Sequence, residues 1–401
     1  MKIVFLIGGV QISGGNYVVV QHALHAAAQG HDVTILTMYR FAPEDLAWHP
    51  GFAEVKVGHL SEAEGQRFDI AIATWWKTAL ELPRLAANQY AYFVQSIESR
   101  FYGESEGAMR RLVDRTYELR MPGITEATWI QAYLQQTYGS AYHLAKNGIR
   151  KDLYADVGDC AEPRVPGKLR VLVEGSLGSP KIKNTARAVR TVRRAQPFET
   201  WLLTTTKLPW YPGVDRLFTS VPIDKVARIY RSCDVIVKLS FIEGMFGPPL
   251  EMFHCGGTAI VYDVSGHDEY IRHGSNALVA KMHDEAQVVA HLKQLRDEPE
   301  LLRTLKAGAR ATAAQWPSWP DASRLFLEHV HALCEAPRVS RDVLTQQVLQ
   351  IRTEFANELG PVSPPSQPPQ PAKRADGALH RARQAVRNAR SLMRYVADGY
   401  R

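Results

Sequence analysis

Apolar and polar residues alternate along the first hundred positions in a pattern that predicts strands and helices in turn. Residues 2–8, KIVFLIG, form an apolar run of strand length, and a glycine-containing loop separates it from an apolar helical segment at 17–31. Similar runs cover 32–38, 68–74 and 89–96. Strands this apolar are typical of parallel sheets that helices bury on both faces. We therefore expect a parallel α/β domain here.

The same alternation begins again after a linker rich in Gly and Pro at 158–168. A strand-like run at 169–175 is followed by a loop at 176–184 and a predicted helix at 185–195. Three further strands and one late helix are predicted at 200–205, 234–240, 257–263 and 323–336. Two such domains side by side would leave a cleft between the carboxyl ends of their strands.

These patterns divide the chain into five parts. The predicted parts are two Rossmann-like domains at 1–160 and 161–335, a helical extension at 336–360, a proline-rich linker at 361–372 and a basic amphipathic tail at 373–401. The fold class is therefore α/β, with two doubly wound sheets facing across a cleft.

Composition supports a soluble globular protein. Of the 401 residues 45% are hydrophobic and 22% are charged, and no apolar run approaches the roughly 20 residues of a membrane span. The first ten residues lack the layout of a signal peptide. Four cysteines without CxxC spacing are typical of reduced thiols, so we expect a cytoplasmic protein.

Most of the net charge of +7 comes from the tail, where eight Lys or Arg residues oppose two Asp residues in 373–401. The remaining chain is nearly neutral, and we expect no nucleic-acid partner for it. Apolar residues of the tail recur at helical spacing. A solvated tail, an anchor on an anionic membrane surface and an arm for a partner all fit this pattern.

The segment FIEGMFGPPLEMFHCGG at 241–257 places one carboxylate on each side of a turn rich in Gly and Pro. Glu243 lies in the loop after a strand, and Glu251 lies in the first turn of the next helix. Backbone N–H groups at a helix N-terminus bind anions such as a diphosphate, and Gly247 would let a ligand approach closely. Glu251 could then accept hydrogen bonds from a ribose diol. The alternative is that Glu251 only caps the helix and Glu243 is a solvated loop residue.

The pair Glu243 and Glu251, with seven residues between them, resembles the E-x7-E signature of retaining glycosyltransferases of family 4, which have the GT-B fold. The similarity runs through 223–280, and the glycine loop near residue 14 and the sequence KNGIRKDLY also resemble the family, so the resemblance covers about residues 1–335. It implies that 1–160 binds the acceptor and 161–335 binds the nucleotide sugar. Glu243 and Lys183 would be the catalytic residues. The implied donor-binding residues are Gly14, Gly15, Ser176, Lys181, Lys183, Phe246, Gly247, Pro248, Leu250 and Glu251.

Several positions depart from the family pattern. Ser176 stands where an Arg is usual, so Lys181 is a candidate second cation beside Lys183. Gln95 replaces a His that faces the sugar in many relatives, and it could hydrogen-bond donor or acceptor but cannot act as a base. Trp75 and Trp76 could form a stacking platform for the acceptor, although core packing is the more ordinary role of such residues.

The resemblance implies a hexosyltransferase that uses a nucleoside diphosphate sugar, with retention, in cell-surface polysaccharide assembly. The acceptor would be a hydroxyl of a glycan or lipid-linked glycan, and the basic tail would hold the enzyme peripherally at the inner membrane face. The chain also resembles rhamnosyltransferases of surface polysaccharide synthesis.

No metal and no cofactor beyond the donor are expected. The alternatives are a GT-B epimerase or phosphorylase, and a degenerate GT-B protein that binds nucleotide sugar or scaffolds a membrane-associated assembly complex without transfer.

Overall fold

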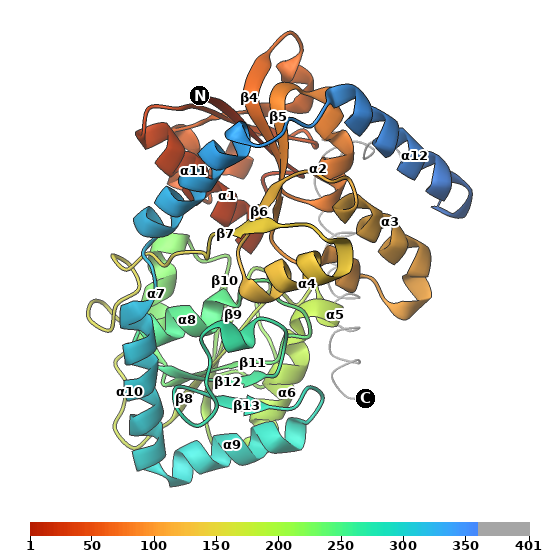
Figure 1. Ribbon diagram of the computed structural model, residues 1–401. Helices are drawn as coiled ribbons and strands as arrows, with labels where there is room; N and C mark the ends of the chain where they lie inside the picture. The colour runs from red at the N-terminus through yellow and green to blue at the C-terminus, as the bar shows by residue number, and fades with distance from the viewer. Residues whose placement is uncertain (360–401) are drawn as a thin grey trace, which may run out of the picture.

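The computed structural model describes residues 1–359 and contains two parallel sheets, one above the other in Figure 1. The predicted linker at 361–372 and tail at 373–401 lie outside the described residues. Within the described part, no helix is both long and apolar enough to cross a membrane.

The first sheet has seven strands in the order β3-β2-β1-β4-β5-β6-β7, and every pairing is parallel. Alternate residues of each strand point to opposite faces, so Ile3 and Phe5 enter one core cluster while Val4 and Leu6 enter the other. The strands are β1 Lys2–Ile7, β2 Asp32–Thr37, β3 Lys56–His59, β4 Arg67–Ala73, β5 Ala86–Val94, β6 Gly123–Thr125 and β7 Tyr142–Leu144. The helices along this part of the chain are α1 Gly14–Ala28, α2 Trp76–Glu81, α3 Gly107–Tyr117 and α4 Thr128–Tyr138.

The second sheet repeats this plan with six parallel strands in the order β10-β9-β8-β11-β12-β13. Its strands are β8 Arg170–Glu174, β9 Glu199–Thr204, β10 Arg216–Thr219, β11 Val235–Lys238, β12 Thr258–Tyr262 and β13 Leu278–Ala280. Its helices are α5 Pro180–Lys183, α6 Thr185–Ala195, α7 Ile223–Ser232, α8 Gly247–His254, α9 Glu285–Asp297 and α10 Pro299–Gln315. The predicted two-domain parallel α/β fold is thus confirmed.

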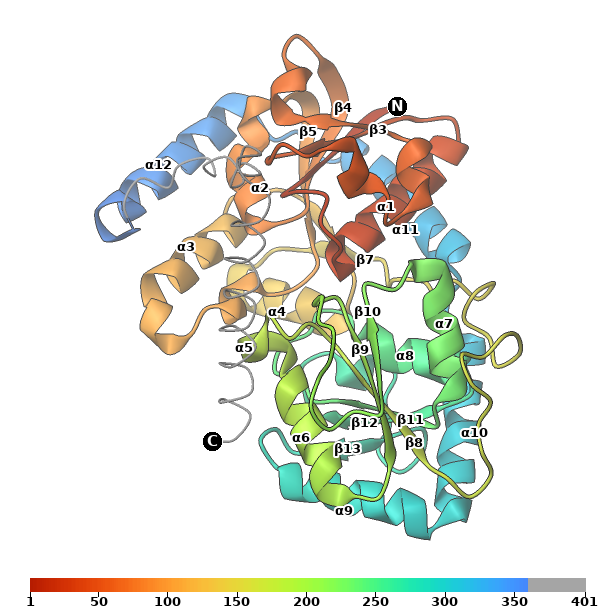
Figure 2. The ribbon, with the colours of Figure 1, turned by 180° about the vertical axis from the view of Figure 1, so that it is seen from behind.

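Two late helices cross back to the first sheet, as Figure 2 shows from behind. In α11, Trp319–Glu335, the ring of Phe326 stacks on His22 of α1 with centroids 3.9 Å apart. Helix α12, Arg341–Leu359, buries Phe355 in the core on the opposite face of that sheet. The sequence prediction counted residues up to 335 with the second domain, whereas α11 packs on the first.

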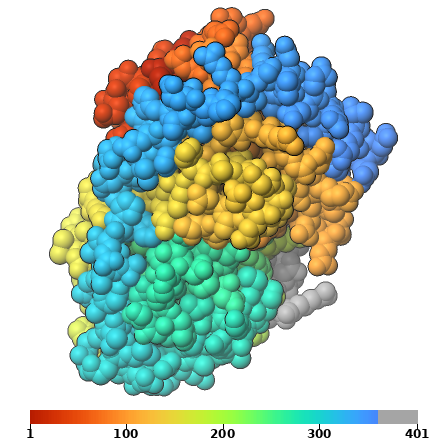
Figure 3. Space-filling model, in the orientation of Figure 1, coloured from red at the N-terminus to blue at the C-terminus, as the bar shows by residue number. Residues whose placement is uncertain are grey.

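In each sheet the order in which successive strands are added reverses once, between β1 and β4 in the first sheet and between β8 and β11 in the second. In doubly wound sheets ligands bind in the crevice that opens at this switch point, beyond the carboxyl ends of the strands. Here those ends face each other across the domain junction, because the loop after β11 contacts the residue after β5: a Cβ on Gly244 would lie 2.0 Å from the carbonyl oxygen of Gln95. Figure 3 shows the two domains in contact on one face of the molecule.

The packing of α11 predicts that Phe326→Ala destabilises the first domain by about 3–5 kcal/mol, because the truncation leaves a cavity between two elements that are far apart in sequence. Hydrogen exchange should rise in peptides that cover β1 and β5, while peptides from β8 and β12 keep their protection. Leu325→Ala is the matched control, since Leu325 is 37% exposed against 2% for Phe326. Equal effects in both sheets would contradict this assignment of α11.

Candidate functional site

Glu243 and Lys183 meet at the switch point of the second sheet. Lys183 ends the short helix α5 after β8, Glu243 lies in the loop after β11, and Lys183 Nζ is 2.8 Å from Glu243 Oε2. Burial raises the pKa of the Glu243 carboxyl, but Lys183 and Lys238 outweigh it and hold that pKa below its usual value. The second oxygen, Oε1, is buried and forms no hydrogen bond of good geometry among the described residues, although the nearby Ser240 hydroxyl also lowers the pKa of this carboxyl. An orphaned acceptor of this kind is costly unless a ligand supplies a donor.

Lys238 is the second cation of the site, and the sequence analysis did not single it out. It ends β11 beside Glu174, the last residue of β8, because these strands pair in register, and its ammonium group donates to the Glu174 carboxylate. Burial lowers the pKa of Lys238, but Glu174, Glu243 and Glu251 together raise it above its usual value. Lys238 is only 3% exposed, so it stays charged because carboxylates surround it.

Glu251 faces the same charge cluster from the second turn of α8, because this helix already begins at Gly247, so its predicted place in the first turn is wrong. Burial and the nearby Glu174 raise the pKa of its carboxyl to about 7, although hydrogen bonding by Tyr230 and Tyr154 and the charge of Lys238 act in the opposite direction. The Glu251 carboxyl therefore changes between its protonated and its ionised form near neutral pH. A carboxyl group in this state can accept hydrogen bonds from a diol once it is ionised.

The N-terminus of α8 offers fewer N–H groups than the sequence analysis expects. Pro248 and Pro249 fill its second and third positions and have no N–H, and the N–H of Gly247 donates to the Met245 carbonyl at 3.0 Å. The space beside Gly247 is open, since a Cβ there would meet nothing within 4 Å. An anion could approach closely here, but most of its hydrogen bonds would have to come from elsewhere.

The side chains of Phe246 and Leu250 do not face the crevice. Both are fully buried in the core of the second domain, and the Phe246 carbonyl accepts a hydrogen bond from the hydroxyl of Tyr270. Any contribution of these two residues to a ligand site would therefore come from their backbone.

The first domain supplies its own glycine loop opposite this site. Ser13 caps α1 through a hydrogen bond from Asn16 N at 3.1 Å, which leaves the N–H groups of Gly14 and Gly15 without an intrahelical acceptor. A Cβ on Gly15 would lie 3.2 Å from the side-chain oxygen of Gln95, so these two predicted residues are brought together. That oxygen is buried and unpartnered among the described residues.

The remaining predicted residues lie at the margin of the site or outside it. Lys181 is 77% exposed and pairs with Glu106 of the first domain at 3.5 Å, so it does not join Lys183 at Glu243. The Ser176 hydroxyl accepts a local hydrogen bond from Gly178 N at 3.2 Å. Trp75 is half-buried against Gly8, whereas Trp76 is 2% exposed in the core, where it cannot stack on an acceptor.

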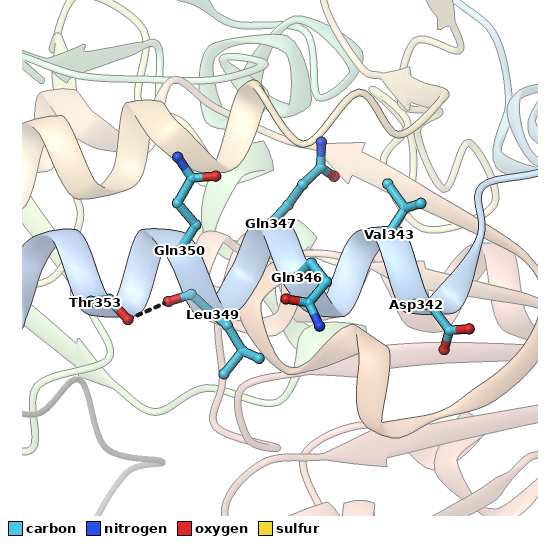
Figure 4. Close-up of a pocket in the computed structure, with 7 residues that line it drawn as sticks. All are labelled: Asp342, Val343, Gln346, Gln347, Leu349, Gln350 and Thr353. Atoms are coloured by element: carbon cyan, nitrogen blue, oxygen red, sulfur yellow. Dashed lines mark hydrogen bonds between the residues drawn. The ribbon is translucent and has the colours of Figure 1, made fainter.

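No cluster of three or more His, Cys, Asp or Glu side chains suited to a metal ion occurs within residues 1–359. A pocket on the outside of α12 is lined by Asp342, Val343, Gln346, Gln347, Leu349, Gln350 and Thr353 (Figure 4). Amide and aliphatic groups predominate there, and none of the predicted site residues is among them. This pocket is therefore no part of the candidate site.

Comparison with known proteins adds an independent observation. Residues 216–312 match the family model described as "Glycosyl transferases group 1". The chain is 27% identical over 270 residues to the O-antigen biosynthesis protein RfbC of Myxococcus xanthus, an alignment that covers 63% of this chain and 20% of that protein. It is 34% identical over 130 residues to a D-inositol 3-phosphate glycosyltransferase of Thermobispora bispora, covering 32% of this chain and 30% of that protein. The chain thus spans less than a third of either relative.

Among solved structures, Anabaena Alr3699/HepE in complex with UDP and glucose superposes with a TM-score of 0.65 at 15% identity, covering 83% of this chain and all of that chain. At this identity the likeness concerns the fold. Together with the group 1 match, it shows that the two facing sheets form the GT-B fold.

The charge cluster predicts that Lys238→Met destabilises the protein by about 3–5 kcal/mol at pH 8, because buried carboxylates lose their cation. Without this cation the pKa of Glu251 rises further. A carboxyl with a raised folded-state pKa stabilises the fold less as the pH rises, so the loss should be smaller at pH 5. Urea denaturation at both pH values measures the difference.

The control for this comparison is Lys181→Met, which removes an exposed lysine that pairs, within residues 1–359, only with Glu106 at 3.5 Å and should leave the denaturation midpoint unchanged. A destabilisation by Lys238→Met that is equal at pH 5 and pH 8 would show that Lys238 acts through packing alone.

Proposed function

We propose that the protein is a glycosyltransferase that moves a hexosyl group from a nucleoside diphosphate sugar to a hydroxyl of a glycan or lipid-linked glycan. The observation that carries the proposal is the orphaned, buried Oε1 of Glu243 at the switch point, opposite the similarly unpartnered oxygen of Gln95. A sugar bears several hydroxyl donors that could satisfy both oxygens. Glu251, at the start of the next helix, would accept from the ribose of the same donor.

Transfer would break the bond between the anomeric carbon and the diphosphate oxygen and form a bond from that carbon to the acceptor oxygen. The departing diphosphate would gain negative charge, which Lys183 and the N–H groups of Gly14 and Gly15 would stabilise. The departing phosphate oxygen would take the acceptor proton on the same face of the sugar, with retention. Gln95 cannot take it, and this route needs no protein base.

Because the cations at the leaving group would be protein residues, we propose that no metal or other cofactor takes part. Activity should then persist in EDTA.

The matched RfbC relative is described as an O-antigen biosynthesis protein, which supports a role in surface polysaccharide assembly. Membership of family 4 rests on the resemblance of the E-x7-E segment alone. A cytoplasmic enzyme with the basic segment 373–401 on the anionic inner membrane face could reach a lipid-linked acceptor. A rhamnosyl donor is one candidate for this setting.

A degenerate GT-B protein that binds nucleotide sugar without transfer is the second candidate. Two observations favour it: the N–H groups missing at Pro248 and Pro249, and the pairing of Lys181 with Glu106 away from the site.

The deciding experiment combines binding with turnover. UDP-, dTDP- and GDP-sugars are tested by thermal shift on the wild type and on Glu251→Ala, and the donors that bind are then tested for nucleotide release with acceptor-containing membranes. A ligand at 100 times its dissociation constant adds about 2.7 kcal/mol of stability. We expect one nucleotide series to stabilise only the wild type and to be turned over. Binding without turnover supports the degenerate protein, and no binding by any nucleotide sugar contradicts both.

The pKa of Glu251 near 7 gives this binding a pH dependence. If the ionised carboxylate accepts from the ribose, the nucleotide affinity should fall roughly tenfold between pH 8 and pH 6, because protonation then competes with binding. Calorimetric titration with UDP measures it. Glu251→Gln is the matched variant: it should bind more weakly at pH 8 and show a flat profile, and a wild-type profile that is equally flat would remove Glu251 from the ribose.

A further inference from the structure

Glu126 of the first domain reaches the loop that carries Glu243. It follows β6, it is 5% exposed, and its Oε1 accepts a hydrogen bond from the backbone N–H of Met245 at 3.0 Å. Its other oxygen accepts from the side-chain amide of Asn147 at 2.8 Å. Both oxygens of the Glu126 carboxylate therefore accept hydrogen bonds from groups at the domain junction.

The same loop is held at the next residue. The indole N–H of Trp129, in α4, donates to the Gly244 carbonyl at 2.9 Å. The side of Gly244 that lacks a side chain lies against the backbone of Gln95 and the carboxylate of Glu126, where a Cβ would be 2.0 and 2.9 Å away. The first domain thus hydrogen-bonds to the two residues after Glu243 and also lies in close contact with Gly244. These contacts hold the Glu243 loop in place from across the cleft.

Glu126 is also joined to the two places where the chain passes between the domains. Asn147, its partner, lies in the first crossing, and the carbonyl of Asn147 accepts from the indole of Trp316 in the second crossing at 2.8 Å. The crossings pair directly through a bridge between Ile149 and Ser318. The carboxylate therefore lies between the interdomain connection and the Glu243 loop.

We propose that Glu126 is a positioning residue that couples the interdomain crossings to the loop of Glu243 and so fixes the position of this loop. A carboxylate suits the task because both groups that it faces are N–H donors and it can accept from each. Burial raises the pKa of this carboxyl to about 7, and the hydrogen bonds from Asn147 and Met245 act in the opposite direction, so the ionised form prevails at pH 8. Glutamine in its place would turn an N–H toward one of these donors. Only the expected effect of Glu126 on catalysis rests on the proposed function. The coupling of the crossings to the Glu243 loop does not depend on it.

The test compares the full-length wild type with Glu126→Gln. Hydrogen exchange is measured for the peptide that contains the Met245 amide, in the absence of ligand, and we expect exchange to be roughly tenfold faster in the variant. Glu81→Gln is the matched control, because Glu81 is also a buried carboxylate of the first domain. It pairs with Arg352 of α12 and does not contact the Glu243 loop. Circular dichroism establishes that both variants are folded.

Activity gives the second readout, with UDP as the binding probe and with the donor that the nucleotide-sugar panel identifies. For Glu126→Gln we expect kcat to fall roughly ten- to hundredfold, since misplacement of Glu243 harms the reacting geometry, while the affinity for UDP is unchanged. Unchanged exchange at Met245, or faster exchange with wild-type kcat, would overturn the proposal. If the wild type turns over no nucleotide sugar, the proposed function fails, and exchange at Met245 alone still decides whether Glu126 fixes the loop.

Discussion

The second-domain site depends on burying one ammonium group, that of Lys238, beneath the crevice. Removing a charge from water is costly, and three carboxylates offset this cost. The effect is mutual, because without the cation Glu174, Glu243 and Glu251 would repel one another within a small volume. The ion pair of Lys238 and Glu174 has its position from the fold, since these residues end β11 and β8, which are neighbours at the point where the strand order reverses. The charged core of the site is therefore part of the sheet itself.

The two carboxylates of the E-x7-E motif are held in different ionisation states by this arrangement. Glu243 has cations on two sides and a depressed pKa, whereas Glu251 has Glu174 beside it and a raised pKa. Glu243 therefore stays negatively charged near neutral pH, whereas Glu251 can gain or lose a proton there. Two glutamates separated by seven residues thus differ in ionisation because their neighbours differ.

The sequence predicted the parts of the fold that rest on continuous apolar runs, such as β1, β4, β8 and β11. It missed the short strands β3, β6, β7, β10 and β13, whose three or four residues carry too little pattern to be separated from loops. Lys238 escaped notice although a lysine inside the apolar run DVIVKLS was a visible signal of a buried ion pair. Glu126 carried no local signal at all, because its partner Met245 is far away in sequence and uses only its backbone.

The order in which the parts of the molecule are made also follows from the path of the chain. The first sheet lacks the cover of α11 and α12 until the last of its helices has been synthesised, whereas the second sheet and its helices form one uninterrupted stretch. On a translating ribosome the second domain can complete its core while one side of β1 and β5 still awaits Phe326. The nascent chain must therefore hold an exposed apolar sheet surface for the time needed to translate the whole second domain, and this is the interval in which assistance from chaperones would matter most.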